Sequence, residues 1–240
     1  MAAPEVGLCY ERAESLAHSL NCPKTLQLAL VGQWRHSLMA DRLSATLQIA
    51  KRLCTLAQEQ NDTLLLIGAY GALACTLYCL GDIETCGQYA MLGLQLWRSL
   101  GAQSSVVELD ADAVSLLCYE AQFELQIGEF VTSQRTMAEA ISLANELNDM
   151  HGLASALGSA ANLGQCERNL AEVERFSSDL IEDGAVWWEG RGRVGPRASW
   201  AGAAVRLSAG FGSDSENRPP CVEAVLPTRS EVEQKASLRN

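Results

Sequence analysis

The sequence predicts an all-α protein in which helical hairpins stack side by side into a solenoid. Apolar residues recur at helical spacing from residue 6 to about residue 182, and the alternation typical of strands is almost absent. Gly, Asn and Asp residues divide this pattern into segments of roughly ten to twenty residues. The turns recur about every 40 to 47 residues, a period typical of helical repeats.

Four helices are expected first, each an apolar stripe followed by a stop signal. Their ranges are 6–20, 26–38, 43–57 and 64–80. Pro23 follows the first stripe, and proline cannot continue a helix from the preceding turn. Asp41, Asn61 and Gly81 follow the other three stripes, and these residue types favour turns.

Five further helices follow in the same manner, at residues 83–96, 114–127, 130–144, 153–163 and 170–181. The helices form pairs: short turns near Asp41, Gly81 and Gly128 lie within a pair, and polar breaks near Asn61 and Asn148 separate pairs. A single pair cannot bury its own apolar face, so neighbouring pairs must pack against each other. The helix at 6–20 takes the place of the second helix of a pair.

The composition excludes several classes of function. Apolar residues make up 48% of the 240 residues, enough for a sizeable core. Eighteen Lys and Arg against 29 Asp and Glu give a net charge of −11, so neither nucleic acid nor an anionic membrane is an expected partner. The start of the chain lacks the basic and apolar regions of a secretory signal, so we expect a cytoplasmic protein with reduced thiols.

One segment has nearly the length and composition of a membrane span. Residues 64–80 carry no charge, but no Lys or Arg flanks them, and they include small residues that let a neighbouring helix approach. A buried helix of a soluble protein is therefore the preferred interpretation over a membrane helix.

The nine cysteines raise the alternative of a metal site. Cys75 and Cys79 share one face of the expected helix, and Cys86 lies two turns further on. The sequence has no C-x-x-C pair and three histidines, His18, His36 and His151, for which it offers no partner. Packing of the cysteines as small apolar residues is therefore expected, with no metal and no other cofactor.

The sequence also gives little sign of catalysis. Residues 190–195 match G-x-G-x-x-G, the pattern of a nucleotide-binding loop, and residues 185–188 could form the short strand before it. However, Pro196 follows the last glycine and no βαβ unit surrounds the match, so we interpret it as coincidental. We expect no enzymatic activity in this chain.

Three spaced groups of residues resemble the tetratricopeptide (TPR) repeat. In that pattern a small residue lies seven positions before the turn glycine and another lies five positions after it, as Ala74, Gly81 and Cys86 do here. The same spacing recurs in Ala121, Gly128 and Ser133 and, more loosely, in Gln33, Ala40 and Ala45. The resemblance implies a right-handed α-α superhelix, with repeats longer than the usual length of about 34 residues.

A more specific resemblance covers residues 6–183. Segments 32–62 and 77–96 are similar to the C-terminal TPR-like arrays of large bacterial signalling proteins. In these proteins the array follows a STAND-type ATPase, sometimes preceded by a class III nucleotide cyclase or a protein kinase domain. The resemblance implies a non-catalytic regulatory or sensor region of a signalling or transcriptional regulator. The alternative is a fragment of a larger adenylate cyclase or ATPase-type enzyme whose catalytic domains are absent here.

The chain is expected to divide into a repeat domain and a tail. The repeat domain covers residues 6–183. Residues 184–240 lose the helical period and contain four of the six prolines together with many glycines and arginines, so we expect this tail to be poorly ordered.

The resemblance places a binding groove on the first helix of each pair. With the small position at Gln33, Ala74, Ala121 and Ala161, the groove residues fall one and four positions later. They are Trp34, Ser37, Cys75, Tyr78, Gln122, Leu125, Asn162 and Gln165. Aromatic rings with polar tips and amides suit a peptide, a protein partner or another domain of a parent signalling protein. The alternative is that Trp34 and Tyr78 only pack between repeats.

Overall fold

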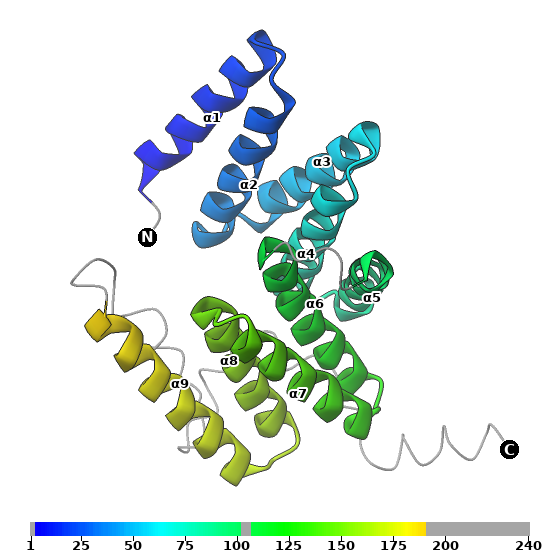
Figure 1. The fold of residues 1–240 in the computed structure, drawn as a ribbon, viewed down its shortest axis with the longest axis vertical. Coiled ribbons are helices and arrows are strands. Elements are labelled where there is room, and N and C mark those ends of the chain that lie inside the picture. The colour runs from blue at the N-terminus through cyan, green and yellow to red at the C-terminus, as the bar shows by residue number, and fades with distance from the viewer. Residues whose placement is uncertain (1–2, 102–106, 191–240) are drawn as a thin grey trace, which may run out of the picture. The chain divides into compact units, whose positions relative to one another are not determined.

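The computed structural model describes residues 3–101 and 107–190, with side-chain positions for residues 3–101 and 111–180. Within these residues every regular element is an α-helix, which confirms the all-α prediction (Figure 1). The helices are α1 (Pro4–Ser19), α2 (Pro23–Met39), α3 (Leu43–Gln60), α4 (Thr63–Leu80), α5 (Ile83–Leu100), α6 (Val107–Gln126), α7 (Phe130–Glu146), α8 (Met150–Cys166) and α9 (Leu170–Gly190).

Each expected helix is present, with differences at a few ends. Helix α6 begins at Val107, earlier than the expected 114, and α9 continues to Gly190, seven residues beyond Asp183. Residues 185–188, weighed above as a short strand, are therefore helical. Of the expected tail, residues 191–240 lie outside the described residues.

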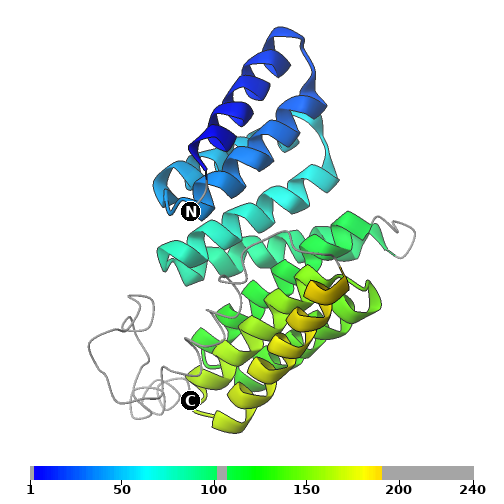
Figure 2. The same ribbon diagram turned by 90° about the vertical axis from the view of Figure 1, so that its left-hand side faces the viewer.

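The chain divides into two compact units, Met1–Glu120 and Ala121–Asn240, with the boundary inside α6. In the first unit, α1 packs against α2, α2 against α3, α3 against α4 and α4 against α5 (Figure 2). In the second unit, α7 packs against α8 and α8 against α9. Packing between sequence neighbours is what a chain of helical hairpins requires.

The connections show why these helices end where they do. Each holds a described residue with positive φ: Asn21, Asp41, Asn61, Gly81, Gly101, Gly128, Asn148 or Arg168. Gly, Asn and Asp tolerate this left-handed conformation better than other residues. Arg168 is not a residue type that favours this conformation, and the expected end of the helix at residue 163 is three residues short of the observed end at Cys166.

Three helices begin at an aspartate that follows directly on a turn. The Asp62 carboxylate accepts a hydrogen bond from the Leu65 amide, and Asp82 accepts one from Thr85. Asp149 accepts one from the His151 amide. These caps satisfy amides that a helix start leaves unpaired. The dipeptides 61–62, 81–82 and 148–149 therefore end one helix and begin the next.

The expected small positions lie inside the helix packing. Ala74, Cys86, Ala121 and Ser133 are each 0% exposed. In the second unit, the Ser133 hydroxyl donates to the Ala121 carbonyl at 2.7 Å, which ties α7 to α6. The looser match is wrong at one position, since Ala45 is exposed and its neighbour Thr46 is buried instead.

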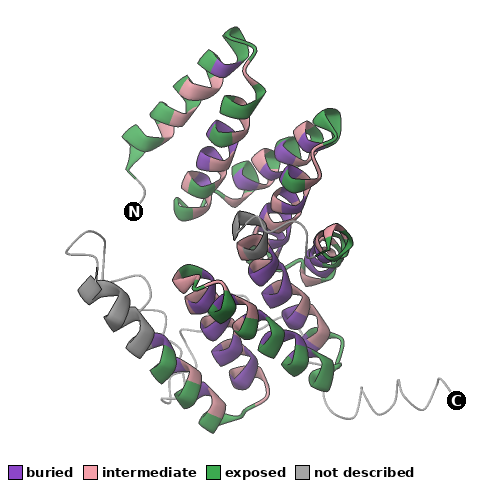
Figure 3. Ribbon diagram, in the orientation of Figure 1, coloured by how far each residue is buried: buried purple, intermediate pink, exposed green. Residues whose placement is uncertain are grey.

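Helix α4 is the most buried helix of the first unit (Figure 3). By length and composition alone it could cross a membrane. Eight of its residues are buried, and it packs against both α3 and α5. These are the contacts of a core helix, and core helices of soluble proteins pass the same test of length and composition.

Candidate functional site

A half-exposed, uncharged stripe runs along α4 in the first unit. Gly71, Cys75 and Tyr78 follow at i, i+4 and i+7, so they share one face of the helix. All three are partly exposed, and apart from adjacent residues and the nearby backbone of α4 itself, no described heavy atom lies within 4 Å of the position that a Cβ on Gly71 would occupy. The Tyr78 ring lies 5.7 Å from the Tyr119 ring, measured between centroids. The stripe thus combines bare backbone, a thiol and an aromatic ring with a polar tip.

Helix α8 carries the equivalent stripe in the second unit. Gly158, Asn162 and Gln165 have the same spacing and are also partly exposed. The space above Gly158 is open in the same way as that above Gly71. The predicted residues Cys75, Tyr78, Asn162 and Gln165 therefore each lie on a face that is open beside a glycine.

Neither glycine was predicted from the sequence to be part of a binding face. A glycine within a helix destabilises it by about 0.5–1 kcal/mol relative to alanine, so its presence calls for a reason. Each of the two lies four residues before a predicted groove residue. That spacing was the signal that could have identified them.

On α2 the predicted residues take part in packing. The Trp34 indole N–H donates a hydrogen bond to the Thr76 hydroxyl at 3.0 Å, which ties α2 to α4. Thr76 is fully buried and itself donates to the Ala72 carbonyl at 2.7 Å. Ser37 is 5% exposed. Trp34 is partly exposed, so part of its ring remains accessible while its polar tip is engaged.

The predicted residues on α6 are also engaged with their neighbours. The Gln122 side chain is buried and donates to the Ser159 carbonyl at 3.2 Å. Its carbonyl oxygen accepts a hydrogen bond from the Asn162 amide at 3.3 Å. Leu125 is 8% exposed. This amide pair connects α6 with α8 inside the second unit, and it places Asn162 at the edge of the packing.

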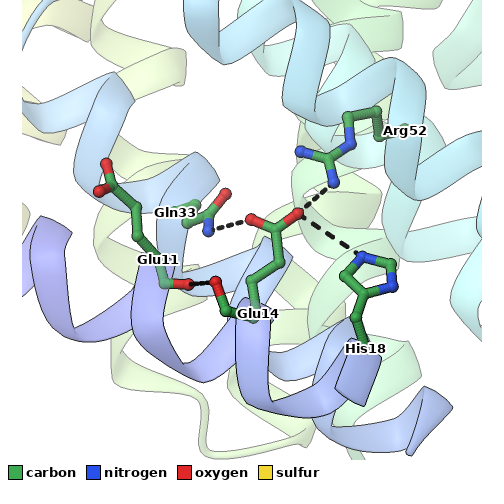
Figure 4. Close-up of polar contacts among 6 residues, drawn as sticks. Glu11, Glu14, His18, Gln33 and Arg52 are labelled. Atoms are coloured by element: carbon green, nitrogen blue, oxygen red, sulfur yellow. Dashed lines mark hydrogen bonds and ion pairs between the residues drawn. The ribbon is translucent and has the colours of Figure 1, made fainter. Parts of the chain in front are cut away.

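A polar cluster on α1, α2 and α3 was not expected (Figure 4). The Glu14 carboxylate accepts a hydrogen bond from the Gln33 amide at 2.6 Å and forms an ion pair with Arg52. His18 lies 3.9 Å from the same carboxylate. Gln33 occupies a position at which the repeat pattern has a small residue. This departure from the pattern was the feature of the sequence that could have indicated a polar contact here. Glu14 therefore ties three helices together.

These contacts alter the acidity of Glu14. Burial raises the pKa of this carboxyl, but the hydrogen bonds from Arg52 and Gln33 and the nearby positive charges outweigh burial, and the pKa lies below its ordinary value of 4.5. A carboxyl whose pKa is lower in the folded state than in the unfolded state stabilises the folded state. This stabilisation is fully present at pH values above the unfolded-state pKa. The stabilisation is lost as the pH falls through the folded-state pKa.

We predict that Glu14→Gln lowers the free energy of unfolding by about 1 kcal/mol at pH 7, since one partly exposed charged hydrogen-bond group is lost. The difference from the unmutated chain shrinks as the pH falls below about 4.5. Urea unfolding between pH 3 and pH 7 measures both quantities. Glu11→Gln, an exposed position on the same helix, is the control and is expected to change stability little. A pH-independent difference would contradict this assignment.

His36 has partners that the sequence did not reveal. The Arg42 guanidinium donates to His36 Nδ1 at 3.0 Å, so Nε2 carries the hydrogen and donates to the Ala3 carbonyl at 3.0 Å. A Cβ on Gly7 would lie 2.8 Å from the imidazole ring. The histidine therefore lies against the start of α1 and ties it to α2.

The chemical character of the site follows from these side chains. Burial raises the pKa of the Cys86 thiol to about 12, as expected for a packing residue. Among the described residues, no group of three or more His, Cys, Asp or Glu side chains could hold a metal ion. The stripes on α4 and α8 offer neutral contact atoms, which suit the binding of a peptide better than acid–base chemistry.

Comparison with known proteins supports the fold. No protein-family model matches the chain, and no curated protein matches it. Among solved structures, the chain is similar to the crystal structure of BtubC (BKLC) from P. vanneervenii, with a TM-score of 0.61 and 14% sequence identity. The alignment covers 95% of this chain and 99% of that chain. At this level of identity the similarity concerns the fold alone, and it is an all-α fold that the two chains share.

Proposed function

We propose that the chain is a non-catalytic protein–protein interaction module, a TPR-like array of helical hairpins stacked into a right-handed superhelix. Sequential packing of neighbouring helices within each unit supports this arrangement. So do the buried small residues at the positions that the repeat pattern assigns to helix contacts. The partner would be a peptide, a protein or another domain of a parent protein.

The observation that carries the proposal is the repeated open stripe on the first helix of a hairpin. Gly71, Cys75 and Tyr78 on α4 and Gly158, Asn162 and Gln165 on α8 are partly exposed and uncharged, with open space above the glycines. A ligand backbone can approach a helix closely where it has no Cβ. Tyrosine and amide side chains next to that point supply an apolar surface and hydrogen-bonding groups for an extended peptide.

Blocking the α4 stripe tests the proposal. Peptides are selected from a random library displayed on phage against the full chain, and their affinities are measured by fluorescence polarisation. Gly71→Phe is expected to weaken binding of the selected peptides at least tenfold, because the ring fills the open space above α4. Its effect on folding is expected to be small, since no described atom outside the adjacent residues and the nearby α4 backbone lies within 4 Å of the new Cβ.

A matched control shows whether the loss of peptide binding comes from blocking the α4 stripe or from adding a phenyl ring anywhere on the hairpin. Gln88→Phe adds the same ring at an exposed position of α5, on the second helix of the same hairpin, and is expected to leave binding unchanged. The proposal would be contradicted if both variants lost the same peptide affinity. It would also be contradicted if the peptides bound Gly71→Phe with the same affinity as the unmutated chain. The same affinity measurement on Gly158→Phe tests whether the α8 stripe also binds the peptides.

The wider role that we propose is a cytoplasmic regulatory or sensor region of a bacterial signalling or transcriptional regulator. It rests on the resemblance of residues 6–183 to the repeat arrays of such proteins. A domain of the parent protein would then be the first partner to test, and it would compete with the selected peptides for the α4 stripe.

A further inference from the structure

Helix α1 carries an exposed apolar stripe that continues onto its C-terminal cap. Its members lie at i, i+3, i+7, i+10 and i+14 and therefore share one face: Val6, Cys9, Ala13, Leu16 and Leu20. Val6 is 44% exposed, Leu16 50% and Leu20 74%. Cys9 is also exposed, and Ala13 is half-buried. The described part of the chain thus leaves this α1 stripe largely open to solvent (Figure 3).

The turns after α1, α3 and α7 show which residues of these helices are equivalent. In each turn a backbone amide bonds to the carbonyl of an alanine near the helix end, namely Ala17, Ala57 or Ala144. The residues eleven positions before these alanines are Val6, Thr46 and Ser133. The stripe on α1 can therefore be compared position by position with the same face of α3 and α7.

This face is covered in the other two helices. On α3, Thr46 is 0% exposed and Leu53, the counterpart of Ala13, is 2% exposed. On α7, Ser133 is 0% exposed, and its hydroxyl donates to the Ala121 carbonyl on α6, the first helix of the same hairpin. The α1 stripe therefore corresponds to the face that a neighbouring helix covers elsewhere in the array.

Helix α2 does not cover the α1 stripe. It contacts another face of α1, at which the Gln33 amide donates to the Glu14 carboxylate. The outer face of a terminal repeat is usually polar, as solubility requires. Here Leu20 is apolar and exposed, whereas its counterpart on α3 is the exposed Gln60. An apolar stripe with spacings of three and four residues is the type of face that packs against another α-helix.

We propose that a second copy of this chain covers the α1 stripe, with the two α1 helices packed antiparallel about a two-fold axis. Two helices joined by a short turn also run antiparallel. The α1 helix of the second copy therefore takes the place that the first helix has in the other hairpins. This dimer surface is separate from the α4 stripe, and it does not rest on the proposed binding function.

The side-chain sizes along the stripe fit an antiparallel pair. With the two-fold axis beside residues 14 and 15, Cys9 lies opposite Leu20 of the second copy, and Ala13 lies opposite Leu16. Each layer then combines a small side chain with a leucine, and the symmetry repeats each contact. In a parallel pair, Ala13 would face Ala13 and Leu16 would face Leu16. One layer would then leave a gap and the other would be crowded.

The charges of α1 also favour the antiparallel pair. Glu5 lies in the first turn of α1, and Lys24 follows directly after the turn at the other end; both are exposed. Antiparallel packing brings Glu5 of each copy towards the end at which Lys24 of the other copy lies. Glu11 is on the face opposite the stripe, and Glu14 is paired with Arg52. The seam therefore avoids close repulsion between acidic side chains, although each chain has a net charge of −11.

Sedimentation velocity of the full chain under reducing conditions, from micromolar to millimolar concentration, tests the proposal. We expect a dimer that dissociates on dilution, because one helix face per copy is smaller than a standard interface of about 800 Å² per partner. Leu16→Glu is expected to raise the dissociation constant of the dimer at least about 100-fold, since each dimer loses two leucine contacts and buries two carboxylates. Circular dichroism of the variant is expected to show unchanged helix content, because Leu16 is half-exposed in the single chain.

Leu8→Glu is the matched control for this substitution. Leu8 is 63% exposed on the same helix and lies outside the stripe, so the dissociation constant is expected to stay unchanged. A monomer at every concentration would overturn the proposal. A dimer that Leu16→Glu weakens no more than Leu8→Glu does would overturn it as well.

A cross-linking experiment with Leu20→Cys tests the antiparallel alignment. A short bismaleimide is expected to join Cys9 of one copy to the thiol introduced at position 20 of the other, a product that peptide mapping identifies. Within one copy these positions lie about 16 Å apart along the helix, beyond the reach of such a reagent. The proposal fails if this link does not form, or if the main link joins the two Cys9 side chains.

Discussion

Leu94→Ala is expected to lower the free energy of unfolding by about 2–5 kcal/mol, because the truncated side chain leaves a cavity in a close-packed site. Leu94 lies on α5 and is 0% exposed. A single domain is typically stable by about 5–15 kcal/mol, so this loss is a large part of the total. Urea unfolding followed by circular dichroism measures it.

Leu92→Ala is the matched control for that prediction. Leu92 lies two residues earlier on α5 and is 44% exposed, so the same truncation removes few contacts. We expect a change of no more than about 0.5 kcal/mol. If the two variants lost equal stability, the face of α5 assigned here to the core would be wrong.

Trp34→Ala is expected to destabilise the chain by about 2–4 kcal/mol, somewhat below the range for fully buried aromatic residues because Trp34 is partly exposed. The substitution removes the ring between α2 and α4 and the hydrogen bond to Thr76. Trp34→Phe keeps most of the ring and is expected to cost about 1 kcal/mol, the contribution of one hydrogen bond.

Measuring both the stability and the peptide binding of Trp34→Ala shows whether Trp34 is a packing residue or a docking residue. Arg35→Ala, at the exposed neighbouring position, is the control and is expected to have an effect below about 0.5 kcal/mol. If Trp34→Ala left the unfolding free energy unchanged and abolished peptide binding, Trp34 would be a docking residue and not a packing residue.

The helices could be predicted from the sequence because their signals are local. Apolar stripes and the turn residues Asn61, Gly81 and Gly128 act within a few positions of each other, and the structure has the expected helices between them. Arg168 shows the limit of such signals, since it adopts positive φ although its residue type gives no indication of a turn.

The contacts of the candidate site could be predicted only in part. A register based on small residues placed Cys75 and Tyr78 on one face, but it could not show that Trp34 donates to Thr76, 42 residues away. It also treated Gln33 as a substitute for a small residue, whereas its amide reaches Glu14 on another helix. Pairing between distant polar side chains depends on how helices meet, and a periodic pattern does not encode it.

The proposed function requires that the first helices of the hairpins carry the binding face. Chemical-shift perturbation by a selected peptide, followed on backbone amides of the isotope-labelled full chain, shows which helices the peptide contacts. We predict that the shifted amides cluster around Gly71, Cys75 and Tyr78 on α4, around Gly158 and Asn162 on α8, or around both. Perturbations confined to the second helices α3, α5 and α7 would contradict the claim.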